Sequence, residues 1–225
     1  MSDLAQPPLF EFNGDTTTGA LELFPLVWSA LEGLTSLDVV QRNQALDNLL
    51  EIQAPRLSPL VAYILVTRLQ DVDVNFRARV IKVLADVLSP DEKGNPASEE
   101  VRQKLLHHLS QIRRRTMYAI LQVCVEGLTP RSDVSVLLNA CPYAGNALAD
   151  ILGDRKTDMA LRKEAAYFIA DVGFLDAVPE LERIRGRLES RQNGQRSMAF
   201  LPPALGDEAE LLPDITKALQ LLVST

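Results

Sequence analysis

The sequence predicts an all-α fold, a right-handed α–α superhelix in which about five helix pairs stack side by side. Two regular features predict it: prolines that recur roughly every 35 residues, and apolar stripes of helical period that each follow an arginine. No run of alternating apolar and polar residues is bounded by hairpin turns, so no strands are expected. Stacking is required because a single helix pair cannot bury both of its apolar faces alone.

The prolines mark where helices begin. Proline is tolerated in the first helical turn, because the N–H it lacks has no intrahelical partner there. Six prolines stand at spacings of 34, 37, 34, 49 and 34 residues, namely Pro25, Pro59, Pro96, Pro130, Pro179 and Pro213. We therefore expect at least nine helices, with each of these prolines within one turn of a helix start.

The second helix of a repeat is marked by a hydrophobic residue followed by arginine. The four arginines at such positions are Arg42, Arg77, Arg113 and Arg162. When they are aligned, the apolar stripe at 76–87 superposes on the one at 161–172, with spacing i, i+4, i+7, i+8 and i+11. This spacing lies on one face of an α-helix. The four segments are therefore predicted to be equivalent helices.

The domain organisation follows from where the repeat starts and stops. Residues 1–24 are predicted to be a tail and lead-in, 25–190 the repeat array, 191–206 an irregular loop, and 207–225 a capping helix. The fourth repeat is long, since 32 residues separate its proline from its arginine against 17 or 18 in the first three. Pro142 should end one short helix, and 144–152 should form another. This insertion either contributes to a binding face or fills a bend of the superhelix.

One turn and its flanking helices are similar to a known repeat family. The segment from Asp71 to Arg77, with LVTRLQ before it and RVIKVLADVL after it, resembles a HEAT repeat, and 161–173 is similar to the second helix of that repeat. The resemblance covers most of 25–178 and is weakest at 96–157. It implies an α-solenoid of the armadillo type and identifies an architecture, not a specific task.

The resemblance also implies a structural role for the arginines. In HEAT arrays, second-helix arginines pair with turn carboxylates of neighbouring repeats. The candidates for such a ladder are Arg42, Arg77, Arg113 and Arg162 with Asp38, Asp71, Asp73 and Asp158. Buried ion pairs of this kind fix the stacking register more than they add stability.

Candidate chemistry centres on the insertion in the fourth repeat. A possible binding loop contains Cys141, Pro142, Tyr143 and Asn146. Cys141 is the one nucleophile candidate, and catalysis would require a base within hydrogen-bond reach. A buried cysteine is the simpler interpretation. No phosphate-binding, metalloprotease or nucleophile-elbow motif is present, so we expect no catalytic residue, cofactor or metal site.

Charge bears on the partners. The chain of 225 residues has a net charge of −7 and contains two basic clusters, at 102–115 and 183–196. Carboxylates of the fourth repeat lie between the clusters, so no nucleic acid partner is expected. The N-terminus lacks the features of a signal peptide, and no apolar run is long enough to span a membrane, so a cytoplasmic protein is expected.

The favoured function is a non-catalytic scaffold or adaptor that presents a curved surface to a protein partner. The alternative is a HEAT-like enzyme or cofactor handler, similar to bilin lyases or to alkylpurine DNA glycosylases, which would use the concave groove. Glycosylases hold their substrate with aromatic side chains. Here the single tryptophan, Trp28, lies within an apolar run and is expected to be buried.

The interrupted positive charge makes a quantitative prediction. Duplex DNA should bind no tighter than about 10⁻⁴ M at ~150 mM salt, because carboxylates between the clusters prevent efficient counterion release. Fluorescence anisotropy with a short labelled duplex, repeated across salt concentrations, measures this. Micromolar binding with a steep salt slope would contradict the scaffold hypothesis and favour the glycosylase-like alternative.

Overall fold

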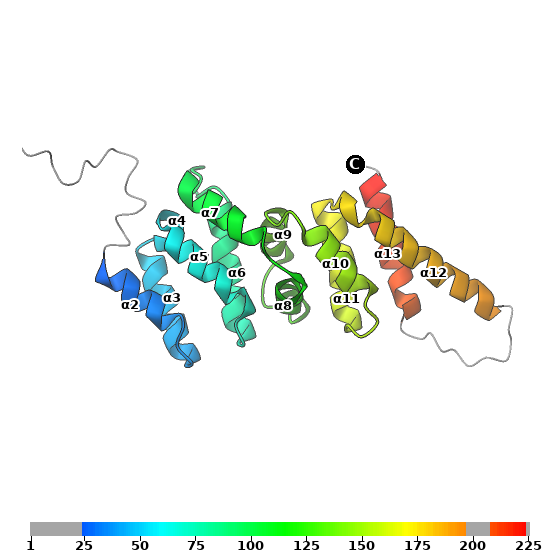
Figure 1. Ribbon diagram of the computed structural model, residues 1–225, viewed down its shortest axis with the longest axis horizontal. Coiled ribbons are helices and arrows are strands. Elements are labelled where there is room, and N and C mark those ends of the chain that lie inside the picture. Colours follow the sequence, from blue (N-terminus) through cyan, green and yellow to red (C-terminus); the bar gives the residue numbers. More distant parts are fainter. Residues whose placement is uncertain (1–23, 197–207, 224–225) are drawn as a thin grey trace, which may run out of the picture.

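The computed structural model describes residues 24–196 and 208–223, which form twelve α-helices, α2 to α13, and contain no strands (Figure 1). The all-α prediction is confirmed for this part of the chain, as is the expected minimum of nine helices. The expected tail at 1–23 and the expected loop from 197 to 206 lie outside the described residues.

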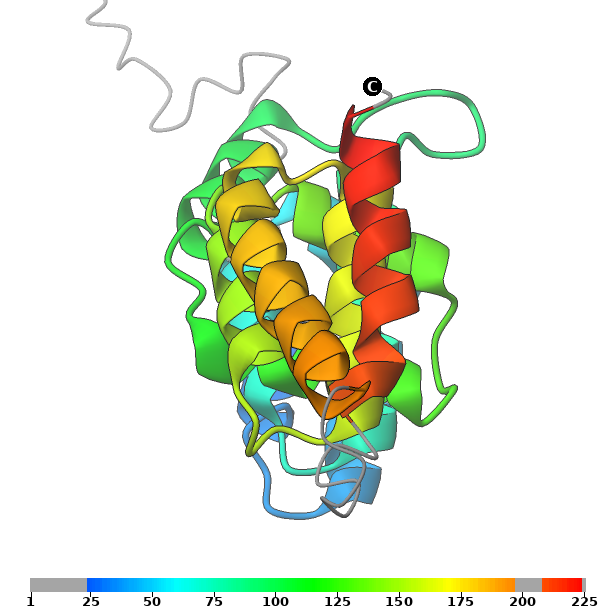
Figure 2. The same cartoon turned by 90° about the vertical axis from the view of Figure 1, so that its right-hand side faces the viewer.

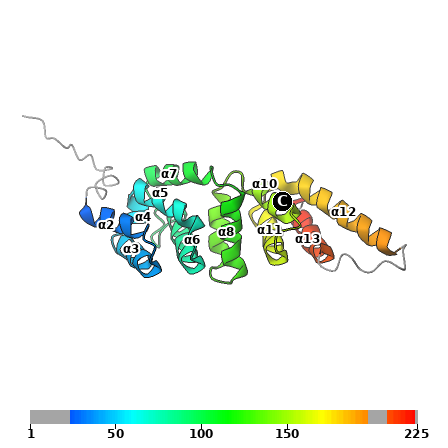
Figure 3. The ribbon, with the colours of Figure 1, turned by 60° about the horizontal axis from the view of Figure 1, so that its bottom comes forward.

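Two rows of helices run along the long axis of the molecule (Figure 3). The first row contains α2 (Pro25–Gly33), α5 (Pro59–Thr67), α7 (Glu99–Leu109), α10 (Ala144–Gly153) and α12 (Val178–Arg196). The second row contains α3 (Val39–Glu51), α6 (Val74–Leu88), α8 (Arg114–Val125), α11 (Met159–Val172) and α13 (Leu211–Val223). Each second-row helix packs against the next, and one contiguous apolar core runs through the stack.

All six marker prolines lie within one turn of a helix start, as predicted. Pro25 and Pro59 are the first residues of α2 and α5, while Pro130 is the N-cap of α9 (Arg131–Asn139). Pro96 lies two residues before Ser98, the N-cap of α7. The other two are the second residue of α12 and the third residue of α13.

Three second-row helices begin in the same way, with an aspartate whose carboxylate accepts a backbone N–H. Asp38 accepts from Val40 at 2.9 Å, Asp73 from Phe76 at 2.7 Å, and Asp158 from Ala160 at 2.8 Å. Such caps satisfy N–H groups that the first turn leaves without partners. The helices α3, α6 and α11 therefore share their starting register.

The shared register places an arginine at the fourth residue of each of these helices. Those residues are Arg42, Arg77 and Arg162, and all three are buried. In α6 and α11 the third, fourth, seventh, eighth and tenth residues are buried. Helix α8 buries the same five positions, but its fourth residue is Met117.

The insertion in the fourth repeat forms the two short helices predicted for it. Helix α9 ends at Asn139, before Pro142, and α10 spans Ala144–Gly153. Helix α10 pairs with α11, whereas α9 packs mainly on α6 and also on α11. Its buried face consists of Val134, Leu137 and Leu138. Helix α9 therefore fills the space between α6 and α11, beside α8.

Two expectations fail at the ends of the array. The irregular loop expected from residue 191 is helical up to Arg196, because RQNGQR has no proline and a single glycine costs only about 1 kcal/mol. Trp28 is 52% exposed rather than buried. Helix α2 buries Val27, Ala30 and Leu31 and packs on α3, and Trp28 lies off this buried face.

The core makes a prediction about local stability. Leu84 in α6 and Ile169 in α11 occupy equivalent, fully buried positions. Truncating either to alanine should lower the free energy of unfolding by about 2–5 kcal/mol through cavity formation. Val72→Ala, at a site that is 91% exposed, is the control and should change it by less than about 0.5 kcal/mol.

Hydrogen exchange on the same variants tests whether the repeats are energetically local. In a stacked array the loss of protection should concentrate in the altered repeat and its neighbours. Equal loss of protection in all units would instead indicate one cooperative globule.

Candidate functional site

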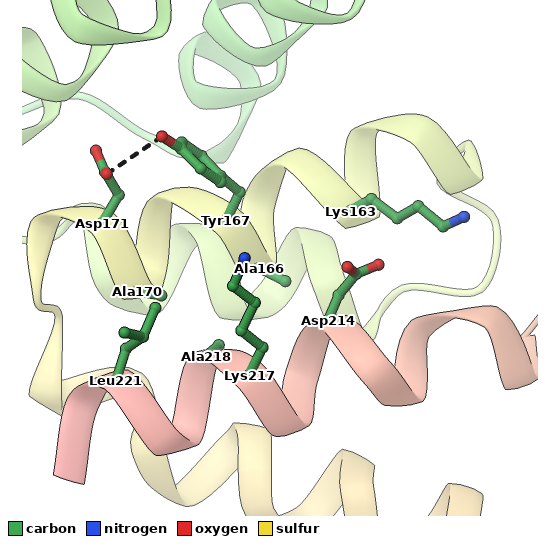
Figure 4. Close-up of a pocket in the computed structure, with 9 residues that line it drawn as sticks. All are labelled: Lys163, Ala166, Tyr167, Ala170, Asp171, Asp214, Lys217, Ala218 and Leu221. Atoms are coloured by element: carbon green, nitrogen blue, oxygen red, sulfur yellow. Dashed lines mark hydrogen bonds between the residues drawn. The ribbon is translucent and has the colours of Figure 1, made fainter. Parts of the chain in front are cut away.

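A groove with a volume of about 120 Å³ lies between α11 and α13 (Figure 4). Its floor is apolar and made of small side chains from both helices, together with Leu221 of α13. The small ones are Ala166, Ala170 and Ala218, and Figure 4 shows them facing one another. We call this feature the α11–α13 groove.

Charged and aromatic side chains rim the groove. Helix α11 contributes Lys163, Tyr167 and Asp171, and α13 contributes Asp214 and Lys217 (Figure 4). The Tyr167 hydroxyl donates to Asp171 at 3.2 Å. Burial and the Asp171 carboxylate raise the pKa of Tyr167, which therefore stays neutral at physiological pH. The rims thus offer both charge signs and a neutral hydroxyl around an apolar floor.

Helix α9 borders the other side of α11. Arg131 forms a bidentate ion pair with Glu164, and its guanidinium lies 4.4 Å from the Tyr167 ring centroid. Ser135 of α9 donates to Asp171 at 2.5 Å. These contacts hold Tyr167 and Asp171 in place, which pre-organises the groove rim. The three helices together form what we call the α9–α11–α13 surface.

Lys163 is oriented by the segment that precedes α13. Its ammonium donates to Glu210 at 2.8 Å, at the end of the 3₁₀ helix η4 (Glu208–Glu210). This hydrogen bond raises the pKa of Lys163 and lowers that of Glu210. The pair is exposed, so its contribution to stability is small. Its effect is to fix a positive charge at one end of the groove.

The residues of the predicted binding loop differ in burial. Pro142, Tyr143 and Asn146 are exposed at the α9–α10 turn, but Cys141 is buried and its thiol donates to the Leu137 carbonyl at 3.2 Å. Burial raises the pKa of the Cys141 thiol to about 12. A thiol of that pKa is almost entirely protonated at neutral pH. Cys141 is therefore a core residue, and the nucleophile hypothesis for it is wrong.

Two arginines of the predicted ladder reach the neighbouring repeat, but only Arg42 pairs with a predicted carboxylate there. The Arg42 guanidinium pairs with Asp71 of the next repeat at 3.0 Å and also donates to the Ser36 and Leu37 carbonyls. Arg77 donates to the Asp71 carbonyl and, in the following repeat, to Gln122, each at 2.8 Å. Of the predicted carboxylates, only Asp71 pairs with an arginine, because Asp38, Asp73 and Asp158 cap helices.

The ladder has a gap at α8. Arg113 is exposed and is the N-cap of α8, so it lies four residues before the position that Arg42 and Arg77 occupy. The prediction for Arg113 was wrong because α8 starts later than its Ile–Arg pair suggested. Arg114, the next residue, pairs with Asp154 instead. Arg162 again follows the pattern, donating to Leu152 at 2.8 Å and to Glu208 at 3.2 Å.

A second depression lies where α5, α7 and α8 meet. Tyr63 stacks on His108 with ring centroids 4.3 Å apart, and Gln70 donates to Thr116 at 2.6 Å. The buried Nε2 of His108 has no hydrogen-bond partner in the part of the chain that the structure describes. Burial, with the charges of Lys104 and His107, lowers the pKa of His108, so the ring is neutral at pH 7. No spacing in the sequence indicates this site, because its residues come from α5, the 3₁₀ helix η2 (Arg68–Gln70), α7 and α8.

The described residues, 24–196 and 208–223, bear on two further properties, metal binding and membrane insertion. These residues contain no group of three or more histidine, cysteine, aspartate or glutamate side chains arranged to hold a metal ion. None of the described helices combines the length and apolarity needed to cross a bilayer. Comparison with known proteins identifies no relative: no family model, curated protein or solved structure matches the chain.

The buried ladder makes a prediction that separates it from surface ion pairs. Arg42→Ala should cost about 3–5 kcal/mol of stability, because it removes the ion-pair partner of the Asp71 carboxylate, which is only 6% exposed, and the donor to two carbonyls. Arg79→Ala removes a half-exposed pair with Asp47, which joins α6 to α3, and should cost only about 0–1 kcal/mol. Urea unfolding followed by circular dichroism compares them, and equal losses would contradict a structural role specific to the ladder.

Proposed function

We propose that the chain is a right-handed HEAT-like α-solenoid that acts as a non-catalytic scaffold, binding a protein partner through the α9–α11–α13 surface. The repeated helix start supports the HEAT-like assignment, since α3, α6 and α11 each combine an aspartate cap with a buried arginine at the fourth residue. Both described cysteines are free thiols, which fits a reducing compartment such as the cytoplasm.

The observation that carries the binding proposal is the composition of the α11–α13 groove. Its floor is apolar, its rims carry Lys163, Lys217, Asp171 and Asp214, and Tyr167 is held by three neighbouring side chains. An apolar centre with a polar rim and a fixed aromatic side chain is the usual anatomy of a protein interface. Ala170 is the floor alanine that is only partly buried, so it leaves room for a larger side chain of a partner.

The enzyme alternative has less support. Its proposed nucleophile, Cys141, is a buried and protonated thiol. Cys124, the other cysteine, has a pKa raised to about 12 by burial and by the charge of Glu164. The groove rim has no such thiol, and its pattern of charges suits recognition of a surface.

A substitution in the groove floor tests the proposal. Ala170→Glu places a carboxylate where partner side chains would pack, so capture of a partner from native lysate should fall at least tenfold, about 1.4 kcal/mol. Ala147→Glu on α10 is the matched control, because Ala147 is also a helical, partly buried alanine but lies in the first row.

The expected result is partner loss for Ala170→Glu alone, with similar melting temperatures for both variants. Equal capture by the two variants would show that the groove does not bind the partner. If no protein is captured by the unaltered chain under conditions that preserve its fold, the scaffold proposal itself fails.

A further inference from the structure

Four arginines converge on one carboxylate at the C-terminal end of the array. Glu208 lies 3.4 Å from Arg155, 3.2 Å from Arg162, 3.7 Å from Arg187 and 2.9 Å from Arg191. They come from the α10–α11 turn, the start of α11 and the C-terminal half of α12. These segments meet at the start of η4, and Figure 2 shows the C-terminal half of α12 (orange) beside the start of α13 (red).

The positive charge of this cluster exceeds its negative charge. Four guanidinium groups face one carboxylate, which leaves three positive charges without a described counterion in the cluster. Neighbouring carboxylates are engaged elsewhere, since Glu180 pairs with Arg183 at 2.5 Å and Glu189 with Arg185 at 3.7 Å. Glu208 attracts the charge of Arg187, and so does Glu180, while Arg155, Arg183 and Arg191 repel it.

The cluster also contains more hydrogen-bond donors than acceptors. The Nε and Nη2 atoms of Arg187 are buried and have no hydrogen-bond partner among the described residues, although Nη2 lies within ion-pair distance of Glu208. Four guanidiniums carry about twenty N–H donors, whereas one carboxylate accepts about four hydrogen bonds. Buried donors without acceptors are costly. The cluster therefore has both the charge and the donors to bind a second oxyanion.

The cluster is accessible from one side. Arg162 is 2% exposed and contacts Glu208 from the buried side, whereas Arg155 is 49% and Arg191 36% exposed. Arg187 lies between these extremes. An incoming anion would thus meet Arg155, Arg187 and Arg191, while the Arg162–Glu208 pair keeps the three guanidiniums close together.

We propose that Arg155, Arg187 and Arg191 form a binding site for a phosphate dianion, with Glu208 as the group that positions them. A phosphate group suits the site because its charge of nearly −2 offsets most of the excess, and its oxygens accept bidentate bonds from planar guanidiniums. The site shares no residue with the α11–α13 groove, so the proposal does not rest on the scaffold function.

The test uses the full chain with inorganic phosphate as the probe. Titration at constant ionic strength, against chloride, is followed by the Nε–Hε NMR signals of arginine and by the melting temperature. Saturable shifts of a few arginine signals and a phosphate-dependent rise in melting temperature are expected. No saturable difference between phosphate and chloride would overturn the proposal.

A pair of charge-matched variants locates the site. Arg187→Gln/Arg191→Gln should weaken phosphate binding at least tenfold, whereas Arg183→Gln/Arg185→Gln, on the same helix with the same charge change, should alter it less than twofold. Equal effects of the two pairs would contradict the site. If the first pair does not fold, Arg155→Gln, at the most exposed member, should still reduce binding several-fold while leaving the melting temperature in chloride unchanged.

The source of the phosphate is addressed with three further probes. A phosphoserine peptide that competes with inorganic phosphate, while its unphosphorylated twin does not, supports a site that reads phosphate groups on proteins. Equal affinity for free phosphate and phosphopeptide supports a small phosphorylated ligand. A duplex DNA that binds far more tightly than either, with a steep salt slope, would overturn the discrete site in favour of a nucleic-acid surface.

Discussion

A buried guanidinium at the fourth residue of a second-row helix constrains the packing of the units around it. A charge removed from water must be paired, and Arg42 and Arg162 each find their carboxylate in the unit that follows, while Arg77 finds an amide there. Because these partners must arrive at hydrogen-bond distance, each helix can take only one position relative to its neighbour. Apolar contacts supply the bulk of the packing, but they tolerate sliding that the guanidiniums do not.

Helix α8, which has no buried arginine at its fourth residue, supports the link between these arginines and the packing of the helices. Among α3, α6, α8 and α11, only α8 has an apolar residue, Met117, at the fourth position. The regular pairing of helices changes at the same place: α7 packs mainly on α5, and α9 is inserted between α6 and α11. The region where the repeat is weakest in sequence is thus the region where packing departs from two simple rows.

Most of the architecture could be predicted from the sequence, because proline position and helical periodicity are local signals. The helix starts at Pro25 and Pro59 and the break near Pro142 follow from such signals. Arg113 could not be placed correctly, since α8 has no aspartate cap to mark its start. The Glu208 cluster could not be predicted from the sequence for another reason. Arg162 and Glu208 are 46 residues apart, and only folding brings them together.

The groove was only partly foreseeable. A concave groove was expected, but which alanines face each other depends on how α13 lies on α11. Similarly, the fourth-repeat insertion was predicted as helices, but not that α9 would supply Arg131 and Ser135 to orient Tyr167 and Asp171. Side-chain convergence across helices is a property of the tertiary structure and leaves no fixed spacing in the sequence.

The absence of a buried arginine at the fourth residue of α8 also has a mechanical consequence. Buried guanidinium–carboxylate pairs join α3 to the turn before α6, and α11 to the turn before α13. Helix α6 instead reaches α8 through the Gln122 amide and packs on α9, whose buried face is Val134, Leu137 and Leu138. Dispersion contacts resist separation but have no preferred direction, so they permit small rotations at little cost. Among the described residues, the junction of α6 with α8 and α9 is therefore the place where a change in the curvature of the array would break no buried ion pair.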